Sequence, residues 1–327
     1  TITRRGLAPL ALLPLAVGAA RAQGEAYPSR VVTLIVPFAA GGSSDILARL
    51  LADQMSRDLG QQVIVENVPG AGGAIAAKRL LSAPADGHTL LVGNTGTLAA
   101  GQFFYRKPAY DPPSDFQAVA SIADAPQMLV ANKDVPVTDF DSFEAYAREN
   151  EGKLNFGAAG IGSGSYLGAA IINSGLGRKI QIVNYRSSGA SLNDLLAGQV
   201  SFLVESTTGS LQHVQSGAVR GVAVLQKNRI AGAPAMKATS ESRFPKVEFR
   251  IWNALVVHKD TPAAIVQRLA ASVRKAVDDP TFKTRTADLG LERPEEAQLS
   301  PAGAQALLVE EGKRWRPLVT SLGVTIE

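Results

Sequence analysis

The sequence predicts an α/β protein made of two similar units, each a doubly wound sheet, and three observations support this prediction. Short apolar runs of strand length alternate with longer segments in which apolar residues recur at helical spacing. This alternation occurs twice along 327 residues, a length more typical of two domains than of one. Most of the apolar runs end in loops of glycine and small polar residues, at the edge where open α/β sheets bind ligands.

Residues 1–22 have the pattern of a cleaved export signal. Arg4 and Arg5 precede an apolar run that ends in Ala-Arg-Ala at residues 20–22, which is the order of basic, apolar and small-residue regions in such signals. The arginine pair also fits a twin-arginine signal, so Sec and twin-arginine export both remain open, and a plain N-terminal helix is the alternative. We expect the mature chain to begin near Gln23. Its formal net charge would be about +1 rather than +4, because the removed segment contains three arginines and no acid.

The composition excludes several classes of function. The chain has no cysteine, which rules out disulfides, thiolate catalysis and cysteine-based metal sites. Its histidines, His88, His213 and His258, are far apart, and we expect them at the surface or at strand edges rather than in a catalytic or metal site. No cofactor fingerprint is present, so no catalytic residue, cofactor or metal is predicted. The mature sequence has neither a basic–aromatic stretch suited to nucleic acid nor a further apolar run long enough to span a membrane.

The first unit should begin with a strand at residues 31–36. A glycine-rich turn follows it, and Ser43 or Ser44 is expected to cap the next helix, with Asp45 in its first turn and Leu59 near its end. The remaining elements are a strand at 62–66, a glycine-rich loop at 67–73, a helix ending near Leu81, a strand at 89–92 and a polar loop at 93–97. This β-α-β-α-β order predicts a parallel, doubly wound sheet.

The loop from Phe38 to Asp45 is a candidate anion site. It leads from a strand into a helix, and the first turn of a helix offers unpaired backbone N–H groups and the positive end of the helix dipole. The loop carries no nucleophile–base pair, metal ligands or Walker lysine. Ligand contact and a simple tight connection both remain open for this loop, and catalysis is not indicated.

The second unit repeats this order. Its expected strands lie at 154–158, 180–184, 200–204 and 219–225, and its helices should start at the loop 159–165, at a cap provided by Ser188 and near Ser206. The loop at 159–165 contains three glycines and two serines, and it fits neither a dinucleotide-binding fingerprint nor a G-x-S-x-G nucleophile elbow. Contact with an anionic or polar ligand is favoured there over plain helix capping. A strand at 128–131 is expected to cross between the units.

The C-terminal part should contain a strand at 251–257 near a return crossover. Thr261 is expected to cap a helix with Pro262 at its first position, and Ser300-Pro301 should start the last helix in the same way. Pro317 is expected to kink or end that helix. Two α/β units with facing glycine-rich edges predict a cleft between domains, a common small-ligand site that closes by hinge motion.

Three further side chains are candidates for the cleft. Glu205 follows a strand, and it either lines the cleft or is an exposed acid at the strand end. Arg186 either pairs with an anionic ligand or faces solvent. Trp252 is expected to pack in the core rather than to line the cleft.

Several segments of the chain resemble one family, the Bug-type extracytoplasmic solute receptors, which serve tripartite tricarboxylate transporters. The similar segments are Tyr27-Pro28-Ser29-Arg30 with VPFAAGGSSDILARLLA at 36–52, VIVENVPGAGG at 63–73, Ala85-Asp86-Gly87, Tyr110-Asp111-Pro112 and DLLAGQV at 194–200. They occur in order over nearly the whole mature chain. The combination of PFxAGGxxD with ENxPGAGG is quite specific.

The resemblance implies a two-domain, type II-like periplasmic binding protein in which crossover strands join two doubly wound sheets and a ligand cleft lies between them. Domain 1 would comprise residues 27–126 and 227–327, and domain 2 residues 127–226. Such a monomeric receptor closes on a small organic carboxylate and delivers it to membrane permease subunits. The ligand-binding residues implied by position are Phe38, Ala40, Gly41, Gly42, Ser43, Ser44, Asp45, Asn94, Thr95, Ala159, Gly160, Ile161, Gly162, Ser163, Tyr185 and Glu205.

The chain departs from the family pattern mainly in the second-domain pocket. It has Ala158-Ala159 in place of a serine pair, Ser163-Gly164-Ser165-Tyr166 in place of Thr-Ser-Pro-His, Tyr185-Arg186-Ser187-Ser188 in place of Tyr-Lys-Gly-Gly, and Glu205 in place of aspartate. The ligand's identity therefore does not carry over. Two alternatives remain: a sensory ligand-binding subunit of the same fold, and an α/β enzyme with Asp45 or Glu205 as its acid–base residue.

Overall fold

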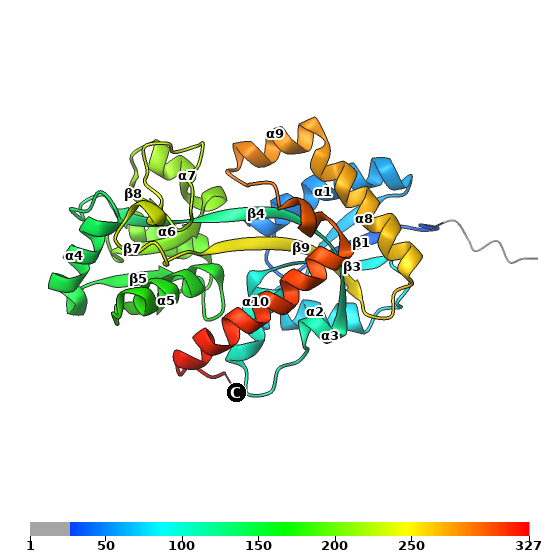
Figure 1. Cartoon of the computed structure of the whole chain (residues 1–327), viewed down its shortest axis with the longest axis horizontal. Coiled ribbons are helices and arrows are strands. Elements are labelled where there is room, and N and C mark those ends of the chain that lie inside the picture. Colours follow the sequence, from blue (N-terminus) through cyan, green and yellow to red (C-terminus); the bar gives the residue numbers. More distant parts are fainter. Residues whose placement is uncertain (1–26, 327) are drawn as a thin grey trace, which may run out of the picture.

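The computed structural model describes residues 27–326, and the predicted export signal lies outside them. Two lobes form an elongated molecule, and two long strands, β4 (Phe116–Asn132) and β9 (Arg250–His258), run from one lobe to the other (Figure 1). The first lobe holds the elements before β4 and after β9, and the second lobe holds the elements between them. The expected domain boundaries near residues 126 and 226 stay a prediction.

The first lobe is built on a parallel sheet with helices on both faces. Its strands are β1 (Val32–Val36), β2 (Val63–Asn67) and β3 (Thr89–Asn94), and its helices are α1 (Ser43–Leu59), α2 (Ala74–Leu81), α3 (Pro112–Asp115), α8 (Ala263–Asp278), α9 (Pro280–Asp288) and α10 (Pro301–Ser321). The strands pair in the order β2-β1-β3. Successive residues of β1 serve two cores: Leu34 packs with buried residues of α1 and α8, and Ile35 with buried residues of α2 and α10.

The second lobe has the same layered construction. Its strands are β5 (Asn155–Ala158), β6 (Gln181–Asn184), β7 (Phe202–Ser206) and β8 (Val219–Val224), and its helices are α4 (Phe140–Asn150), α5 (Gly164–Leu176), α6 (Ser188–Leu196) and α7 (Thr207–Gln215). Because β7, β5 and β6 are parallel neighbours, their carboxyl ends lie at one edge. Phe140, Phe143, Phe156 and Phe202 are almost completely buried and stack on one another in edge-on or tilted pairs.

The two crossover strands join both lobes into one mixed sheet. β4 pairs with β9 over residues 116–126 and then, from Gln127 onwards, with β7 and β8. The strand order is β2-β1-β3-β9-β4-β7-β5-β6, with β8 also paired to β4. The sequence predicted only the end of β4, as a strand at 128–131, whereas the observed strand is 17 residues long.

Two predicted serine caps are wrong by one residue. Gly42, in an extended conformation, is the N-cap of α1, so Ser43 and Ser44 lie inside the first turn and provide no side-chain cap. Ser187 caps α6, and Ser188 is the first residue of that helix. In both cases the residue with extended backbone angles takes the cap position, and sequence alone does not show which of two neighbours that is.

For two helices the sequence predicts a cap residue followed by proline, and the structure confirms the cap in only one of them. Ser300 caps α10 as predicted, but Thr261 provides no cap for α8, whose N-cap is Pro262. α10 does not end at Pro317, because it is packed on the core through residues such as Trp315, which is 1% exposed. Among residues 27–326, no helix combines the length and apolar content needed to cross a membrane.

Candidate functional site

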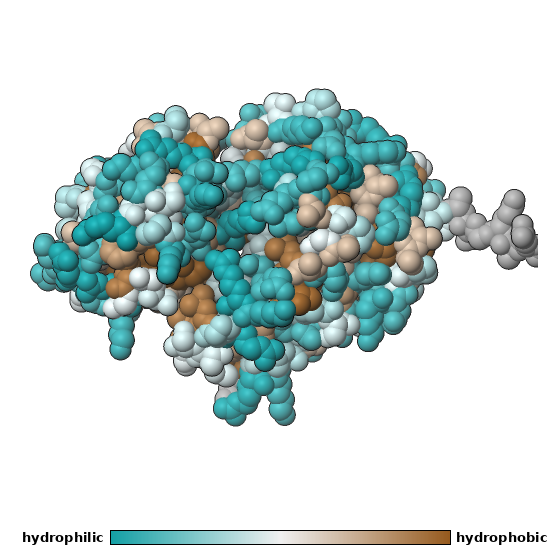
Figure 2. All heavy atoms as spheres, viewed as in Figure 1, coloured by the Kyte–Doolittle hydropathy of each residue, from teal (hydrophilic) through white to brown (hydrophobic). Residues whose placement is uncertain are grey.

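Glycine-rich loops of the two lobes face each other. The loops after β1 and β3, and those after β5, β6 and β7, lie at the carboxyl ends of parallel strands. A Cβ atom on Gly96, after β3, would lie 3.1 Å from the carbonyl oxygen of Gly162, after β5. Phe104 and Tyr166 pack edge to face between the lobes, with ring centroids 5.8 Å apart. The structure thus brings together the two predicted loops, and the molecular surface is hollowed between the lobes (Figure 2).

Asp45 holds the loop between β1 and α1 in place. Its side chain is almost fully buried; Oδ2 accepts the Gly41 N–H at 2.8 Å, and Oδ1 accepts the Asn67 amide at 3.0 Å. Arg49 lies 2.9 Å from Oδ1, and the Asn67 amide also donates to the carbonyl oxygen of Phe38 at 3.0 Å. Burial alone would raise the pKa of Asp45, but the hydrogen bonds from Arg49, Gly41 and Asn67 outweigh it and lower the pKa. The carboxylate is therefore engaged in fixing the loop.

The first turn of α1 is open towards this loop. Its N-cap, Gly42, has no side chain, and no other side chain of the described residues caps the turn, whereas the N-cap serines of α5 and α6 each accept a first-turn N–H. Gly41 has a φ of +84°, which favours glycine. Ala40, Gly41 and Gly42 are exposed, Ser43 is half-buried and Ser44 is buried. The uncapped N–H groups and the helix dipole make this turn suited to an anion.

The loop after β3 is ordered by its own polar groups. Oδ1 of Asn94 accepts the backbone N–H groups of Gly96 at 2.9 Å and of Thr97 at 3.3 Å. Thr95 is fully buried, and its Oγ1 accepts the backbone N–H of Trp252 at 3.0 Å. Thr95 therefore joins the loop to β9, while Asn94 lies beside Gly96, next to the opposite lobe.

The loop after β5 is shaped by two glycines and ends in a helix cap. Gly160 and Gly162 have φ values of +99° and +82°. Ser163 caps α5 through its hydroxyl, as the sequence allowed, and the N–H of Ala159 donates to a second serine of the loop. Ile161 is 36% exposed and presents apolar surface. The loop thus offers backbone groups and one apolar side chain rather than a charged group.

Tyr185 follows β6 and is tied to the second lobe. Its N–H donates to the carbonyl oxygen of Ala158 at 2.7 Å, and its phenol donates to Oδ2 of Asp194 at 2.8 Å. Burial and this hydrogen bond raise the pKa of the Tyr185 phenol. A Cβ atom on Gly157 would touch the ring at 3.4 Å, so the ring packs against β5.

Glu205, at the carboxyl end of β7, is buried, so its interpretation as an exposed strand-end acid is wrong. The residue is 9% exposed, and its Oε1 accepts the N–H of Ser206 at 3.0 Å. Its Oε2 is buried and accepts no hydrogen bond within the described part of the chain. Burial raises the pKa of Glu205, and hydrogen bonds from Ser206 and Ser188 offset this rise only in part. The carboxyl group lies between the first turns of α6 and α7.

The remaining candidates are placed more simply. Trp252 is 1% exposed and donates to Glu311, which confirms its prediction as a core residue. Arg186 is exposed and bonds to no described residue. His88 is buried at 6% exposure against Tyr27, so it does not lie at the surface, although it lies at a strand end, directly before β3. Within residues 27–326, no cluster of histidine, aspartate and glutamate has the grouping of a metal site.

The sequence did not identify Asn67 as part of the site. Its amide joins Asp45 to the carbonyl oxygen of Phe38, so it links β2 to the loop after β1. The ENVPGAGG segment that contains Asn67 was the available signal. Two surface hollows, of about 190 and 380 Å³, flank α2, and none of the sixteen predicted ligand-binding residues lines either of them.

Comparison with known proteins places this geometry in a family. The family model described as "Tripartite tricarboxylate transporter family receptor" matches residues 47–324. A UPF0065 protein from the tcbD-tcbE intergenic region of Pseudomonas sp. (strain P51) is 35% identical over 318 residues, covering 97% of this chain and 93% of the relative. Protein BugT of Bordetella pertussis is 30% identical over 310 residues, covering 94% of both chains.

Solved structures of similar proteins have the same fold. MatC of Rhodopseudomonas palustris, solved with bound malate, is 35% identical with a TM-score of 0.82, over 90% of this chain and all of MatC. The periplasmic binding protein BugD is 32% identical with a TM-score of 0.83, over 92% of this chain and all of BugD. Both the resemblance and the predicted two-lobed α/β fold are therefore confirmed. The chain belongs to the tripartite tricarboxylate transporter receptor family, the family of the Bug proteins.

Proposed function

We propose that this protein is a periplasmic solute receptor that captures a small organic carboxylate between its lobes and delivers it unchanged to a tripartite tricarboxylate-type permease. The open first turn of α1 carries the proposal, because it presents uncapped backbone N–H groups at the carboxyl edge of the first lobe's parallel sheet. MatC, a relative, was solved with malate, and a second R. palustris relative, 31% identical with a TM-score of 0.84 over 91% of this chain and 99% of its own, was solved with adipate. The proposal includes export to the periplasm and action as a monomer.

The proposed ligand contacts come from both lobes. A ligand carboxylate would accept the free N–H groups at Gly42 and Ser43, with Asn94 alongside it in the same lobe. The loop after β5 would close on the ligand from the other lobe and supply backbone groups and the apolar side chain of Ile161. Backbone donors and ordered water can hold a carboxylate without a charged partner, which fits the absence of a free lysine or arginine among the sixteen predicted residues.

An enzymatic role has less support. Asp45 is engaged by Arg49, Gly41 and Asn67, so its carboxylate is already fully hydrogen-bonded. Among residues 27–326, no histidine, lysine or second carboxylate is a hydrogen-bond partner of Glu205, and acid–base catalysis requires a paired group or a substrate proton within reach. We therefore propose binding without chemical conversion.

A thermal-shift screen tests the proposal. Purified mature protein would be screened against mono-, di- and tricarboxylates, including malate and adipate, with acidic amino acids and aromatic acids as further ligands. A ligand that binds only the folded state adds to the free energy of unfolding and so raises Tm. At a ligand concentration of one hundred times Kd, the added stability is about 2.7 kcal/mol. A carboxylate hit that is recovered unchanged supports the receptor, whereas conversion of the hit points to an enzyme.

The Gly42→Val variant tests the position of the site. The φ of Gly42 is −80°, and an added Cβ would meet only the Ala39 carbonyl oxygen at 3.7 Å, so valine fits the fold while covering the open turn. We expect Kd for the hit to rise at least tenfold, roughly 1.4 kcal/mol. Gly152→Val is the control, since a Cβ at Gly152, in the other lobe, meets nothing within 4 Å. Unchanged affinity in Gly42→Val would disprove ligand contact at α1.

A further inference from the structure

We propose that the outward side of α2 is a docking surface for an acidic, partly apolar protein segment, which we assign to an extracytoplasmic loop of the membrane permease. This α2 surface consists of Ile75, Lys78 and Arg79 on the helix together with the two hollows that flank it. The surface itself is independent of the ligand, and only the assignment of its partner to the permease rests on the proposed function.

The apolar part of the α2 surface is unusual for this chain. Four large apolar residues of the described chain are notably exposed: Ile75 of α2 at 51%, Ile64 at 40%, Val31 at 39% and Ile161 at 36%. Ile64 pairs with Thr33 in the β1–β2 register, so these two side chains point to the same face of the sheet, and Val31 directly precedes β1. Thr33 and Ile75 both line the larger hollow. Exposed apolar residues that lie near one another mark an interaction surface more often than isolated ones do, and here Ile64 adjoins Thr33, which lines the hollow with Ile75.

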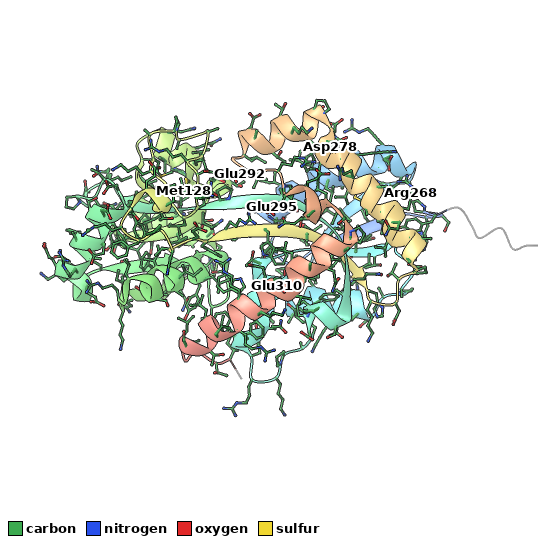
Figure 3. The ribbon with its side chains drawn as sticks, viewed as in Figure 1. Met128, Arg268, Asp278, Glu292, Glu295 and Glu310 are labelled. Carbon is green, nitrogen blue, oxygen red and sulfur yellow. The ribbon has the colours of Figure 1, made fainter. Side chains whose placement is uncertain are left out.

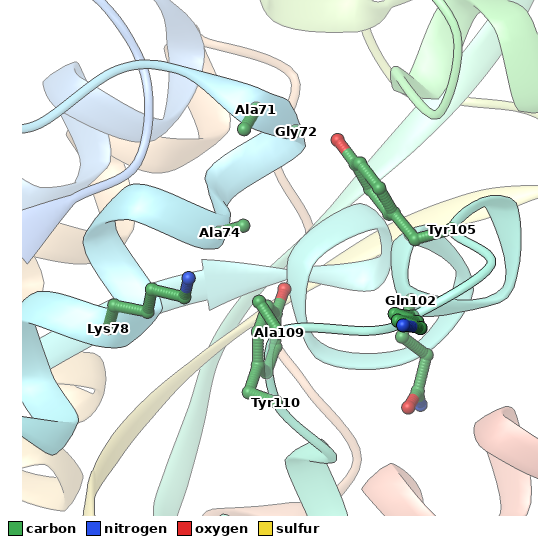
Figure 4. A pocket seen from close by; sticks show the side chains of 10 residues that line it. Ala71, Gly72, Ala74, Lys78, Gln102, Tyr105, Ala109 and Tyr110 are labelled. Carbon is green, nitrogen blue, oxygen red and sulfur yellow. The ribbon is translucent and has the colours of Figure 1, made fainter. Parts of the chain in front are cut away.

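The charge of the α2 surface is positive. Lys78 lines both hollows and makes no ion pair within the described chain, and Lys107 lines the smaller hollow and is likewise unpaired. Arg79 is already paired with Glu66 at 3.1 Å. Figure 4 shows the side chain of Lys78 extending from α2 near Ala74, at the smaller hollow. The surface therefore has two free ammonium groups and no free carboxylate to balance them.

These features define the chemistry of the partner. Unpaired ammonium groups beside apolar side chains are complementary to a segment in which an aspartate or glutamate lies among apolar residues. Loops of a membrane protein outside the cytoplasm lack the excess of lysine and arginine found in cytoplasmic loops, so they do not repel this surface. A periplasmic receptor meets such loops whenever it reaches its permease.

The α2 surface is also in direct contact with the ligand-binding loops. The three glycines before α2, Gly70, Gly72 and Gly73, all have positive φ values. A Cβ atom on Gly73 would overlap Cγ2 of Thr97 and lie 3.3 Å from Cβ of Pro37, and a Cβ on Gly70 would lie 2.6 Å from Cδ1 of Ile75. This turn therefore packs against Ile75 on one side and against the loops after β1 and β3 on the other. The turn before α2 thus lies between the proposed docking surface and the ligand-binding loops.

Photo-crosslinking in cells tests the docking surface directly. A benzoylphenylalanine replaces Ile75 in the full chain, produced in the bacterium that carries the permease, and adducts are identified by mass spectrometry. We expect an adduct with a permease segment that contains an acidic residue among apolar ones. Adding Lys78→Glu to the same chain should lower the adduct yield about fivefold or more, because the charge complementarity is reversed. A photoprobe at Lys153, an exposed and unpaired lysine of the second lobe, should give no such adduct.

Three crosslinking results would overturn the proposal: an adduct only with a second copy of this chain, an adduct only with residues 1–26 of the same chain, or no adduct with a membrane protein. A fourth would be a permease adduct whose yield is unchanged by Lys78→Glu. The thermal-shift screen separates this proposal from the receptor function. If a permease adduct forms but no carboxylate raises Tm, docking at α2 is supported and the carboxylate ligand is rejected. If a carboxylate raises Tm but no permease adduct forms, only docking at α2 is rejected.

Discussion

At the scale of single residues, the site depends on the carboxylate of Asp45, which holds the loop in place and which we do not expect to contact the carboxylate of the ligand. Asp45 satisfies the N–H of Gly41 and the amide of Asn67, and it pairs with Arg49. These three groups come from the loop, from β2 and from α1, so one side chain sets how the open turn of α1 lies against its neighbours. The acidic residue in the first turn, which sequence reasoning included among possible catalytic groups, is better explained as part of the loop's support.

We predict that Asp45→Asn destabilises the protein and weakens ligand binding. The asparagine amide would face the donors of Gly41 and Arg49, so at least one of these partly exposed hydrogen bonds would be lost, at a cost of about 1 kcal/mol. Urea unfolding at pH 7 measures the loss of stability, and titration calorimetry measures Kd for the carboxylate found by thermal shift. Asp53→Asn, at an exposed position of the same helix, is the control and should behave as wild type.

The pH dependence of the Asp45 effect has a definite sign. The pKa of Asp45 is lower in the folded protein than in the unfolded chain. Its contribution to stability is therefore present above the unfolded value and is lost as the pH falls through the folded value. The stability difference between wild type and Asp45→Asn should shrink in acid. A difference that is constant from pH 7 down to the acid transition would contradict this account.

At the scale of secondary-structure elements, β4 shows where prediction from sequence stops. The helices and parallel strands have strong apolar periodicity, and their predicted positions agree with the structure to within one or two residues at most ends. The part of β4 that pairs with β9, residues 116–126, is rich in alanine and contains Asp124 and Pro126, which are poor strand formers. Its conformation is fixed by pairing with β9, more than one hundred residues away, and a local pattern does not record that pairing.

β4 also carries a buried acid where pairing passes from β9 to the second lobe. Asp124 is 2% exposed, and Arg250 lies 3.1 Å from its Oδ2, while Oδ1 accepts no hydrogen bond within the described chain. Burial raises the pKa of Asp124 to about 6 despite Arg250, and the nearby carboxylates of Glu292, Glu295 and Glu311 add to the rise. Figure 3 shows Glu292 and Glu295 close to the crossover strands, between the lobes.

We predict that Asp124→Asn stabilises the protein more at pH 8 than at pH 5. The unfolded carboxyl has its ordinary pKa of 3.8, so as the pH rises towards 6 the unfolded chain releases a proton that the folded protein retains, and wild-type stability falls. Asparagine removes this loss, so its effect relative to wild type should become more favourable by about 1–2 kcal/mol between pH 5 and pH 8. Urea unfolding at both pH values measures the change.

Asp134→Asn, at an exposed site, is the control for Asp124→Asn. Its effect should be the same at both pH values, because its carboxyl lies in water in both states. If Asp124→Asn also shows no dependence on pH, burial does not control the proton affinity of Asp124. A decrease in relative stability at pH 8 would show instead that the Arg250 ion pair outweighs the cost of burying the charge.

At the scale of the whole molecule, the site exists only because two separate sheet edges meet. Sequence patterns identified the loops after β1, β3 and β5, since each has glycines and small polar residues at a strand end. They did not show which loops lie opposite each other, nor that Glu205 would be buried between two helix starts, because both depend on how β4 and β9 place one lobe against the other. The family resemblance supplied that arrangement as an expectation.

The close approach of Gly96 to Gly162 makes the meeting of the lobes testable. A Cβ on Gly96 would lie 3.1 Å from the Gly162 carbonyl oxygen and 3.2 Å from Oδ1 of Asn94, which is tighter than side chains normally pack. The backbone of Gly96 has no positive φ, so alanine and valine can adopt its conformation. Added bulk there should act mainly by keeping the loops after β3 and β5 apart.

We predict a graded loss of affinity in Gly96→Ala and Gly96→Val, with Kd for the carboxylate hit rising about tenfold or more in the valine variant, roughly 1.4 kcal/mol. If closure of the lobes accompanies binding, X-ray scattering should show a smaller radius of gyration when wild type is saturated with ligand, and a reduced change for Gly96→Val. Gly152→Val should match wild type in both measurements. Wild-type affinity and the full change in radius for Gly96→Val would mean that the approach of these two loops plays no part in the ligand-bound state.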